Sequence, residues 1–246
     1  MAFTRFMLQL FNKLNSEIDS TVKDRPKKIL SLGYPDMLVS REFLSETFGN
    51  NLGEKIPYHE ESESIMRWHN VHNHLEGIPD TRAFLEELGY QLDIVDIVQA
   101  RGAEIILDLN YPIDQKFHQQ YDIIIDGGTI EHCFNIAQAI KNIALSVREG
   151  GFILNCNPFS CFNHGFYNLN PTFYFDFYTD NGFDIVFQEL IINAVVDPKL
   201  ISVPPTRRFI DGPIDASNIL IAQRHTVQDI EWPVQTKYKI NSGLKG

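Results

Sequence analysis

The chain has 246 residues, of which 43% are hydrophobic and 22% are charged, so it can bury one sizeable core and does not have the composition of a disordered protein. Its 21 basic and 32 acidic residues leave a net charge of −11, which disfavours nucleic acid and anionic membranes as partners. The three cysteines cannot pair off evenly, which is typical of a reducing compartment, and we expect a cytoplasmic protein.

Residues 1–27 are predicted to form an N-terminal helix. Apolar residues recur at helical spacing from Phe3 to Ile18, and Arg5 and Lys13 interrupt a run that is too short to span a bilayer. We expect the apolar stripe to pack on the rest of the domain or on a second copy of the chain in a homodimer. A helix lying on a membrane surface is the alternative.

Residues 28–246 are predicted to form one α/β domain. The apolar run 29–33 indicates a buried strand. Asp36 is then expected to cap a helix over residues 37–48. The polar stretch 50–77 has no clear period, and we interpret it as an insertion over the sheet edge or the site.

Strands that end in acidic residues follow the insertion. A helix is predicted over residues 81–88, and apolar runs indicate strands over 92–95, 104–107 and 121–125, which are followed by Asp96, Asp108 and Asp126. Ligands of open α/β sheets bind beyond the carboxyl ends of the parallel strands, so chemistry is expected at these residues.

The second half of the chain continues the alternation of helices and strands. An apolar helix face runs from Ile136 to Val147, and glycines 150 and 151 are expected to end this helix. Next come a strand over 152–155, a helix over 171–180 that begins with a proline, and strands over 183–192 and 219–224. Such an alternation predicts a doubly wound α/β sheet, because parallel neighbours need crossover connections.

Three segments carry a resemblance to a known family: YDIIIDGGTIEH at 121–132, REGGFIL at 148–154 and NGFDI at 181–185. In this order they resemble the class I S-adenosylmethionine-dependent methyltransferases, especially those that modify small molecules and sugars. The resemblance implies a mostly parallel, Rossmann-like sheet of seven strands, the last antiparallel. It also implies that S-adenosylmethionine binds across the carboxyl ends of the first four strands.

The resemblance also assigns cofactor-binding residues. They are Gly33, Asp96, Asp108, Leu109, Asp126 and Gly127. Gly33 would be the first glycine of the cofactor loop, Asp96 would hold the ribose hydroxyls and Asp108 would lie near the adenine amino group. Tyr34 and Pro35 stand where the family has further glycines, which changes how closely the loop backbone can approach a ligand.

Transfer of a methyl group to an oxygen needs a base that takes the proton of the acceptor. His132 and His164 are the candidates, because histidine titrates near neutral pH. Glu131 would orient His132 or bind a hydroxyl of the substrate, and Asn163 and Tyr167 would line the acceptor pocket. The alternative for His132 is a capping or packing role, and for Glu131 it is an interaction with the helix dipole.

A second group of histidines lies in the insertion: His59 beside Glu60, then His69, His72 and His74. Their spacing fits no established zinc signature, and no cysteine is near them in the sequence. We interpret them as solvated or pocket-lining side chains and expect no metal site.

The sequence therefore favours an enzyme that transfers a methyl group from S-adenosylmethionine to an oxygen, or less favourably a nitrogen, of a small polar acceptor such as a sugar or its activated derivative. A non-catalytic binding or scaffold protein of the same fold, with an altered cofactor loop, is the alternative. A nucleotide-binding enzyme of another class is a weaker hypothesis, because neither a phosphate-binding lysine loop nor a dinucleotide glycine pattern is present.

Overall fold

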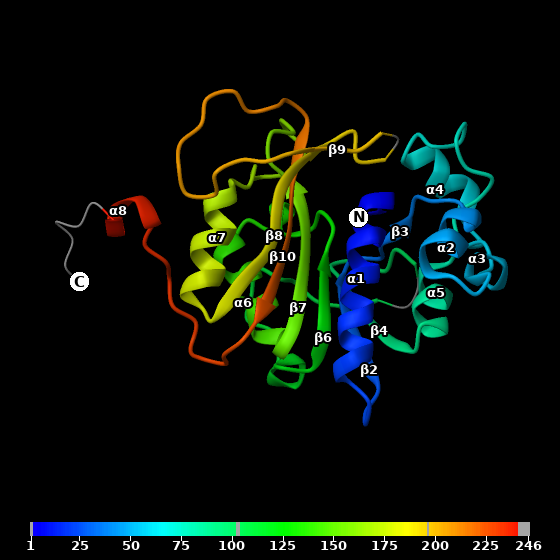
Figure 1. Cartoon of the computed structure of the whole chain (residues 1–246), viewed down its shortest axis with the longest axis horizontal. Helices are drawn as coiled ribbons and strands as arrows, with labels where there is room; N and C mark the ends of the chain where they lie inside the picture. Colours follow the sequence, from blue (N-terminus) through cyan, green and yellow to red (C-terminus); the bar gives the residue numbers. More distant parts are fainter. Residues whose placement is uncertain (1, 102–103, 196, 241–246) are drawn as a thin grey trace. The chain divides into compact units, whose positions relative to one another are not determined.

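The computed structural model describes residues 2–101, 104–195 and 197–240, and its elements are labelled in Figure 1. The chain divides into two compact units. The first comprises Met1–Leu107 with Ala194–Asp197, and the second comprises Asp108–Asn193 with Pro198–Gly246.

The first unit is built on parallel strands. Its strands are β1 (Ala2–Phe3), β2 (Lys27–Leu32), β3 (Asp36–Met37), β4 (Tyr90–Asp96) and β5 (Ile105–Ile106). Its helices are α1 (Arg5–Thr21), α2 (Arg41–Phe48), α3 (Leu52–Lys55), α4 (Ser62–Trp68) and α5 (Thr81–Glu87). Strand β4 pairs in parallel with β2 on one side and β5 on the other, and β1 pairs in parallel with β3. The strands expected at 29–33, 92–95 and 104–107 are therefore present.

Helix α1 packs its apolar stripe within the first unit. Packing on the rest of the chain was one of the two expectations for the stripe of residues 1–27. Thr4 caps it, since its hydroxyl accepts from the amide of Met7, and its apolar stripe is buried. Phe11 is fully buried, with its ring 6.2 Å from that of Phe84 and 5.8 Å from that of Tyr90. Burial of one such side chain stabilises the fold by about 1.5–3 kcal/mol, which fixes the helix on its unit.

The helix expected over residues 37–48 begins later, at Arg41. Ser40 is its cap, with the hydroxyl accepting from the amide of Phe43, so the prediction that Asp36 caps it was wrong. Asp36 lies in β3, and its carboxylate is instead bound by Arg101 at 3.2 Å. A buried carboxylate needs a partner of opposite charge, and no local pattern indicates that this partner comes from 65 residues away.

The insertion at 50–77 contains structure that its composition did not reveal. It carries α3 and α4, and Ile65 and Val71 form a small core with Leu38 and Ile78. Beyond it, α5 lies where a helix was expected over residues 81–88, and Asp80 caps it, because its carboxylate accepts from the amide of Ala83.

The second unit combines a parallel pair with antiparallel strands. Its strands are β6 (Tyr121–Asp126), β7 (Val147–Pro158), β8 (Phe183–Ile192), β9 (Lys199–Ile201) and β10 (Ala216–Arg224). Its helical segments are η1 (Gln115–Phe117), η2 (Ile130–His132), α6 (Ile136–Ser146), α7 (Pro171–Asp180) and α8 (Thr236–Ile240). Strand β6 is parallel to β7, whereas β10 lies between β7 and β8 and is antiparallel to both.

Helix α6 ends at Ser146, so the prediction that glycines 150 and 151 end it was wrong. The glycines lie within β7, where the strand bulges: from Tyr121↔Val147 to Ile123↔Phe152 the register advances two residues on β6 and five on β7. Gly150 has a φ of +77°, and a Cβ at Gly151 would lie 2.9 Å from a carbonyl oxygen of β6. Gly150 thus allows the backbone conformation of the bulge, and Gly151 allows the close approach of β6.

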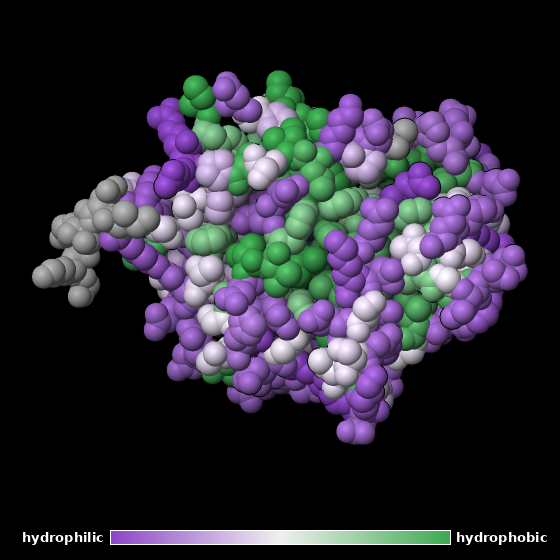
Figure 2. Space-filling model, viewed as in Figure 1, coloured by the Kyte–Doolittle hydropathy of each residue, from purple (hydrophilic) through white to green (hydrophobic). Residues whose placement is uncertain are grey.

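All seven expected strands are present, and the last one, β10, is antiparallel, as the resemblance implied. The doubly wound, Rossmann-like α/β class is confirmed, with β9 as an additional strand that pairs with β8. In the described ranges, no helix is long and apolar enough to cross a membrane. Hydrophobic residues gather over β8 on the face shown in Figure 2. Val186 of this strand is an exposed apolar side chain, and a homodimer stays a prediction.

Candidate functional site

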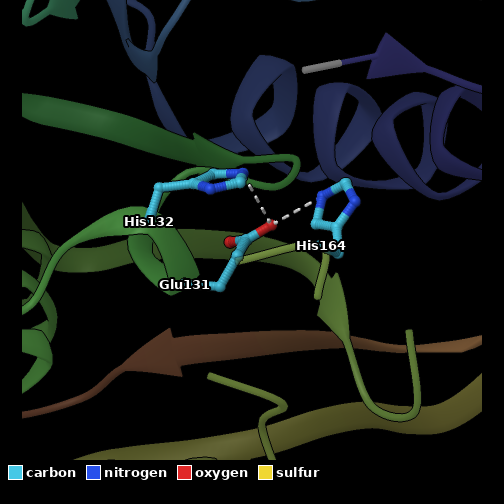
Figure 3. A group of neighbouring side chains, drawn as sticks. All are labelled: Glu131, His132 and His164. Carbon is cyan, nitrogen blue, oxygen red and sulfur yellow. Dashed lines mark ion pairs between the residues drawn. The ribbon is translucent and has the colours of Figure 1, made fainter. Parts of the chain in front are cut away.

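The candidate site lies beyond the carboxyl end of β6, within the second unit. Strand β6 ends at Asp126, a turn through two glycines follows, and the short helix η2 then carries Glu131 and His132. The segment after β7 brings His164 to the same place, so that both imidazole rings point toward the carboxylate of Glu131 (Figure 3). The three residues that we expected to be catalytic are therefore neighbours.

One oxygen of Glu131 is the centre of this group. Its Oε1 lies 3.5 Å from Nε2 of His164 and 3.8 Å from Nε2 of His132, and the two rings are 5.1 Å apart. The Glu131 side chain is 0% exposed, whereas those of His132 and His164 are 49% and 53% exposed. The group thus places a buried carboxylate behind two histidines that solutes can reach.

Two glycines allow the backbone to approach Glu131 this closely. A Cβ at Gly165 would lie 2.8 Å from the carbonyl oxygen of Glu131, which accepts a hydrogen bond from the amide of Phe166. Gly128 has a φ of +105°, and a Cβ there would lie 3.2 Å from Oε1. Larger residues at either position would displace the carboxylate or the loop that carries His164.

Two asparagines of β7 hold the acidic side chains from behind. The amide nitrogen of Asn157 donates to Oε2 of Glu131 at 3.0 Å and to Oδ2 of Asp126 at 2.8 Å. Asn155 donates to the same oxygen of Asp126 at 3.0 Å. These donors satisfy carboxylates that would otherwise be buried without partners.

Two tyrosines of α7 fix the orientation of the asparagines. The hydroxyl of Tyr174 donates to the side-chain oxygen of Asn157 at 2.5 Å, and that of Tyr178 donates to the oxygen of Asn155 at 2.9 Å. None of these two asparagines and two tyrosines was predicted to belong to the site. The available signals were the spacing of two between the asparagines, which puts both on one face of a strand, and the spacing of four between the tyrosines on a helix.

Burial dominates the electrostatics of the acidic pair. It raises the pKa of Glu131 to about 7, and the neighbouring charge of Asp126 adds to the increase while the hydrogen bond from Asn157 opposes it. Burial also raises the pKa of Asp126 and lowers that of His132, where the charge of His164 acts in the same direction. Glu131 is therefore poised to gain or lose a proton near neutral pH.

Asp126 is fully buried, and its carboxylate accepts hydrogen bonds from Asn155, Asn157 and the amide of Thr129. Asp126 therefore shares the donor Asn157 with Glu131. Direct contact of Asp126, or of the half-buried Gly127, with a cofactor stays a prediction.

The predicted acceptor residues lie close to His164 in the chain. Asn163 is exposed and adopts a left-handed conformation with a φ of +58°. The hydroxyl of Tyr167 donates to the carbonyl of Phe134 at 2.9 Å, and the exposed rings of Phe134 and Phe166 pack edge to face at 5.5 Å. The loop therefore offers an aromatic surface beside the histidines.

The predicted cofactor residues of the first unit lie at the ends of its strands. Gly33 follows β2 with a φ of +83°, which favours glycine, and its amide donates to the carbonyl of Val95 at 2.7 Å. Asp96 ends β4, and one oxygen of its carboxylate accepts from the amide of Val98 at 3.2 Å. Tyr34 is buried, and its hydroxyl accepts from the amide of Thr81.

The remaining predicted cofactor residues belong to the second unit. Asp108 accepts from the backbone and side-chain nitrogens of Asn110, at 2.9 and 2.7 Å, and Leu109 is buried. Their roles toward adenine stay predictions.

Two histidines of the insertion have identified partners in the first unit. His69 binds the carboxylate of Asp36 at 3.0 Å, and the ring of His59 packs against Tyr34. Among the described side chains, Glu131, His132 and His164 are the group whose ligand atoms converge, all within 4.8 Å of one another.

Comparisons by sequence find no matching protein-family model and no matching curated protein. Solved structures that are similar in fold include several methyltransferases. One is the 1,6-didemethyltoxoflavin-N1-methyltransferase of Burkholderia thailandensis, solved with 1,6-didemethyltoxoflavin and S-adenosylhomocysteine. It has 12% identity and a TM-score of 0.42, over 87% of this chain and 77% of that one.

Two others are similar to a comparable degree. The CurJ carbon methyltransferase has 10% identity and a TM-score of 0.47, over 89% of this chain and 54% of that one. TehB from Haemophilus influenzae has 13% identity and a TM-score of 0.45, over 85% and 61%. This chain thus spans less than two thirds of the length of either. Likenesses this weak carry no argument about activity, and the fold assignment rests on the helices and strands themselves.

Proposed function

We propose that the protein is an S-adenosylmethionine-dependent methyltransferase that acts on an oxygen, or less favourably a nitrogen, of a small polar acceptor. The observation that carries the proposal is the convergence of Glu131, His132 and His164 beyond the carboxyl end of β6 in a Rossmann-like fold. A buried carboxylate whose pKa is raised to about 7 stands there behind two half-exposed imidazoles.

The first unit has a side chain suited to the cofactor. Asp96 uses one carboxylate oxygen for the amide of Val98, and within the described residues its Oδ2 has no hydrogen-bond partner. That oxygen can accept from a ribose hydroxyl. Ile97 and Val98, which follow directly, are exposed large apolar side chains, and such a surface suits a planar adenine. These features support binding of adenosine by this segment.

The residues of the second unit would handle the proton of the acceptor. S-adenosylmethionine supplies an electrophilic methyl group, and its sulfur keeps the bonding electron pair and leaves as a neutral thioether. His132 or His164 would take the proton of the acceptor hydroxyl at a ring nitrogen while the oxygen forms its bond to the methyl carbon. The buried carboxylate of Glu131 would stabilise the imidazolium that results.

The aromatic surface beside the histidines supports a small acceptor with both polar and apolar faces. Phe134 and Phe166 are exposed and pack edge to face, two residues after His132 and His164 respectively, and Asn163 adds an exposed amide. A sugar or its activated derivative would present hydroxyl groups to the histidines and the face of its ring to the aromatic pair.

One observation favours the alternative of a non-catalytic protein of this fold. The loop after β2 is held rigidly: the amide of Gly33 is already bonded to Val95, and Tyr34 is bonded to the start of α5. A loop whose backbone amide is already hydrogen-bonded within the protein has fewer donors left to bind a ligand.

Calorimetric titration of the full chain with S-adenosylmethionine and S-adenosylhomocysteine distinguishes the two functions. Saturable binding of both, lost in Asp96→Ala, supports the enzyme, and transfer of a labelled methyl group to candidate sugars then tests the activity. Absence of binding at millimolar cofactor would contradict the enzyme and favour the binding or scaffold protein.

A further inference from the structure

One carboxylate oxygen of Glu131 is buried without a hydrogen-bond partner among the described residues. Oε1 is inaccessible to solvent, and no described residue forms a hydrogen bond with it. Nε2 of His164 lies 3.5 Å from this oxygen and Nε2 of His132 lies 3.8 Å from it, and both separations are long for a hydrogen bond (Figure 3). A buried carboxylate oxygen without a hydrogen bond costs free energy. We therefore expect a bound group to interact with this oxygen.

The separations fit three ligands around one metal ion. Imidazole nitrogens and carboxylate oxygens bind zinc at about 2.0–2.2 Å, and two ligands at that distance from a tetrahedral ion lie about 3.4 Å apart. The nitrogen–oxygen distances of 3.5 and 3.8 Å are close to this value. The three side chains also come from two separate segments of the second unit and meet with their ligand atoms facing each other.

We propose that Glu131, His132 and His164 bind a divalent transition-metal ion. Two imidazoles and one carboxylate suit zinc, cobalt or nickel, whereas magnesium and calcium prefer sets of oxygen ligands. Three protein ligands leave at least one coordination position for another molecule. That position faces solvent, because both histidine side chains are about half exposed while Glu131 is buried.

The residues behind the ligands support this assignment. Asn157 donates to Oε2 of Glu131, so the other oxygen is held toward the histidines, and Tyr174 in turn fixes Asn157. Hydrogen bonds of this kind, made to the ligand by residues that do not bind the metal themselves, orient a metal-binding carboxylate. Gly128 and Gly165 keep side-chain atoms away from the same space.

The role of the ion rests on the proposed function. A bound ion would coordinate the acceptor oxygen and lower the pKa of its hydroxyl, whose proton would pass to water before the oxygen attacks the methyl carbon. With an ion present, His132 and His164 act as ligands and not as bases. The acceptor class is then one with a hydroxyl that can bind a metal ion.

Metal binding can be tested without cofactor or acceptor. The full chain is stripped with a chelator, dialysed and titrated calorimetrically with ZnCl₂ and, separately, with MgCl₂; CoCl₂ is added to follow the visible absorption of cobalt. We expect one equivalent of Zn²⁺, a cobalt spectrum of low coordination number and no comparable binding of Mg²⁺. Glu131→Gln, His132→Ala and His164→Ala should each weaken Zn²⁺ binding by at least about tenfold.

His72→Ala is the matched control, because His72 is an exposed histidine of the first unit and should leave Zn²⁺ binding unchanged. Circular dichroism and thermal unfolding of each stripped variant show whether it folds, and Glu131→Gln keeps the shape of the buried side chain. Failure of the folded wild-type chain to bind Zn²⁺ would overturn the inference, as would equal Zn²⁺ affinity in the wild type and the three ligand variants. Titration with S-adenosylmethionine in the presence of chelator tests the proposed function separately. Cofactor binding without Zn²⁺ binding would contradict only the metal site, whereas absence of cofactor binding would contradict the proposed function.

Discussion

Asn157 holds Oε2 of Glu131 at 3.0 Å and thereby leaves Oε1 facing His132 and His164. The same nitrogen donates to Asp126 at 2.8 Å, so one neutral amide serves two buried acids. The amide cannot flip without loss, since its oxygen accepts from the hydroxyl of Tyr174. A single asparagine thus sets the direction in which the carboxylate of the site points.

Replacement of this asparagine should weaken both the fold and the site. Asn157→Ala removes a donor from two buried carboxylates and the acceptor of a buried tyrosine hydroxyl, and we expect a loss of about 2 kcal/mol in the free energy of unfolding. Zn²⁺ affinity should fall by about 10–100-fold, as for other residues that orient metal ligands. Urea denaturation and calorimetry measure the two effects. Asn168→Ala, at an exposed position, should change neither; wild-type stability in Asn157→Ala would show that the hydrogen bonds contribute nothing.

Glycine is required at position 165 by the close approach of two backbones. In Gly165→Ala the new Cβ would meet the carbonyl oxygen of Glu131 at 2.8 Å and its Cγ at 2.9 Å, so the loop that carries His164 must move. We expect about 1–3 kcal/mol of destabilisation and weaker Zn²⁺ binding, measured by thermal unfolding and calorimetry. In the control Gly212→Ala the Cβ would approach ring atoms of Phe159 at 3.2 Å, which can shift. Equal behaviour of the two variants would argue against a tight contact at position 165.

The raised pKa of Glu131 predicts how stability depends on pH in metal-free protein. The carboxyl ionises near 4.5 when unfolded and near 7 when folded, so between these values the unfolded chain binds fewer protons. The free energy of unfolding should therefore fall as pH rises from 4.5 to 7, by up to about 3 kcal/mol from this group, and then level off. Asp126, whose pKa is also raised, acts in the same direction.

Glu131→Gln isolates this contribution, because glutamine fills the same space and does not ionise. Urea denaturation with chelator at pH 5, 6, 7 and 8 should give a shallower decline for the variant than for the wild type. Glu46→Gln, at a side chain for which no ion pair is present in the described residues, serves as control and should follow the wild type. Parallel pH dependences of wild type and Glu131→Gln would mean that Glu131 is not buried as a neutral acid.

Local sequence patterns predicted most of the fold. Runs of apolar residues located the seven strands, and the helices expected over 81–88 and 171–180 are present as α5 and α7. The errors arose where distant residues compete with local signals. Asp36 had the position of a helix cap, but Arg101 and His69 bind it, and the glycines at 150 and 151 form a bulge that depends on pairing with β6.

The candidate site was predictable in part. Glu131, His132 and His164 were identified because histidines and acids follow the ends of strands, but their convergence depends on the path of the loop after β7. Neither Asn157 nor Tyr174 was expected, since an asparagine within a strand and a tyrosine within an aromatic helix are ordinary for those elements. The metal-like geometry was not expected either, because the ligands are not spaced in the sequence as in known zinc motifs.

The loop after β2 should depend on the hydroxyl of Tyr34. It accepts from the amide of Thr81 at 3.2 Å and lies 3.3 Å from the carboxylate of Asp80, and burial raises the pKa of the tyrosine to about 12. Tyr34→Phe leaves that amide without a partner and should lower the free energy of unfolding by about 1–2 kcal/mol. Urea denaturation measures the loss, and Tyr111→Phe, at an exposed tyrosine, should show none. Unchanged stability in Tyr34→Phe would mean that water replaces the hydroxyl without cost.

Asp96 should control cofactor affinity without controlling the fold. Its Oδ1 accepts from the amide of Val98, and Oδ2 is the oxygen proposed for a ribose hydroxyl. Asp96→Asn keeps an oxygen for Val98 but replaces the second acceptor with a donor, so we expect S-adenosylhomocysteine to bind at least about tenfold more weakly, with stability unchanged within about 0.5 kcal/mol. Asp229→Asn, at an exposed acid, is the control for the loss of one negative charge. Calorimetry on both variants decides the matter: equal losses would point to net charge as the cause, whereas wild-type affinity in Asp96→Asn would remove this residue from the cofactor site.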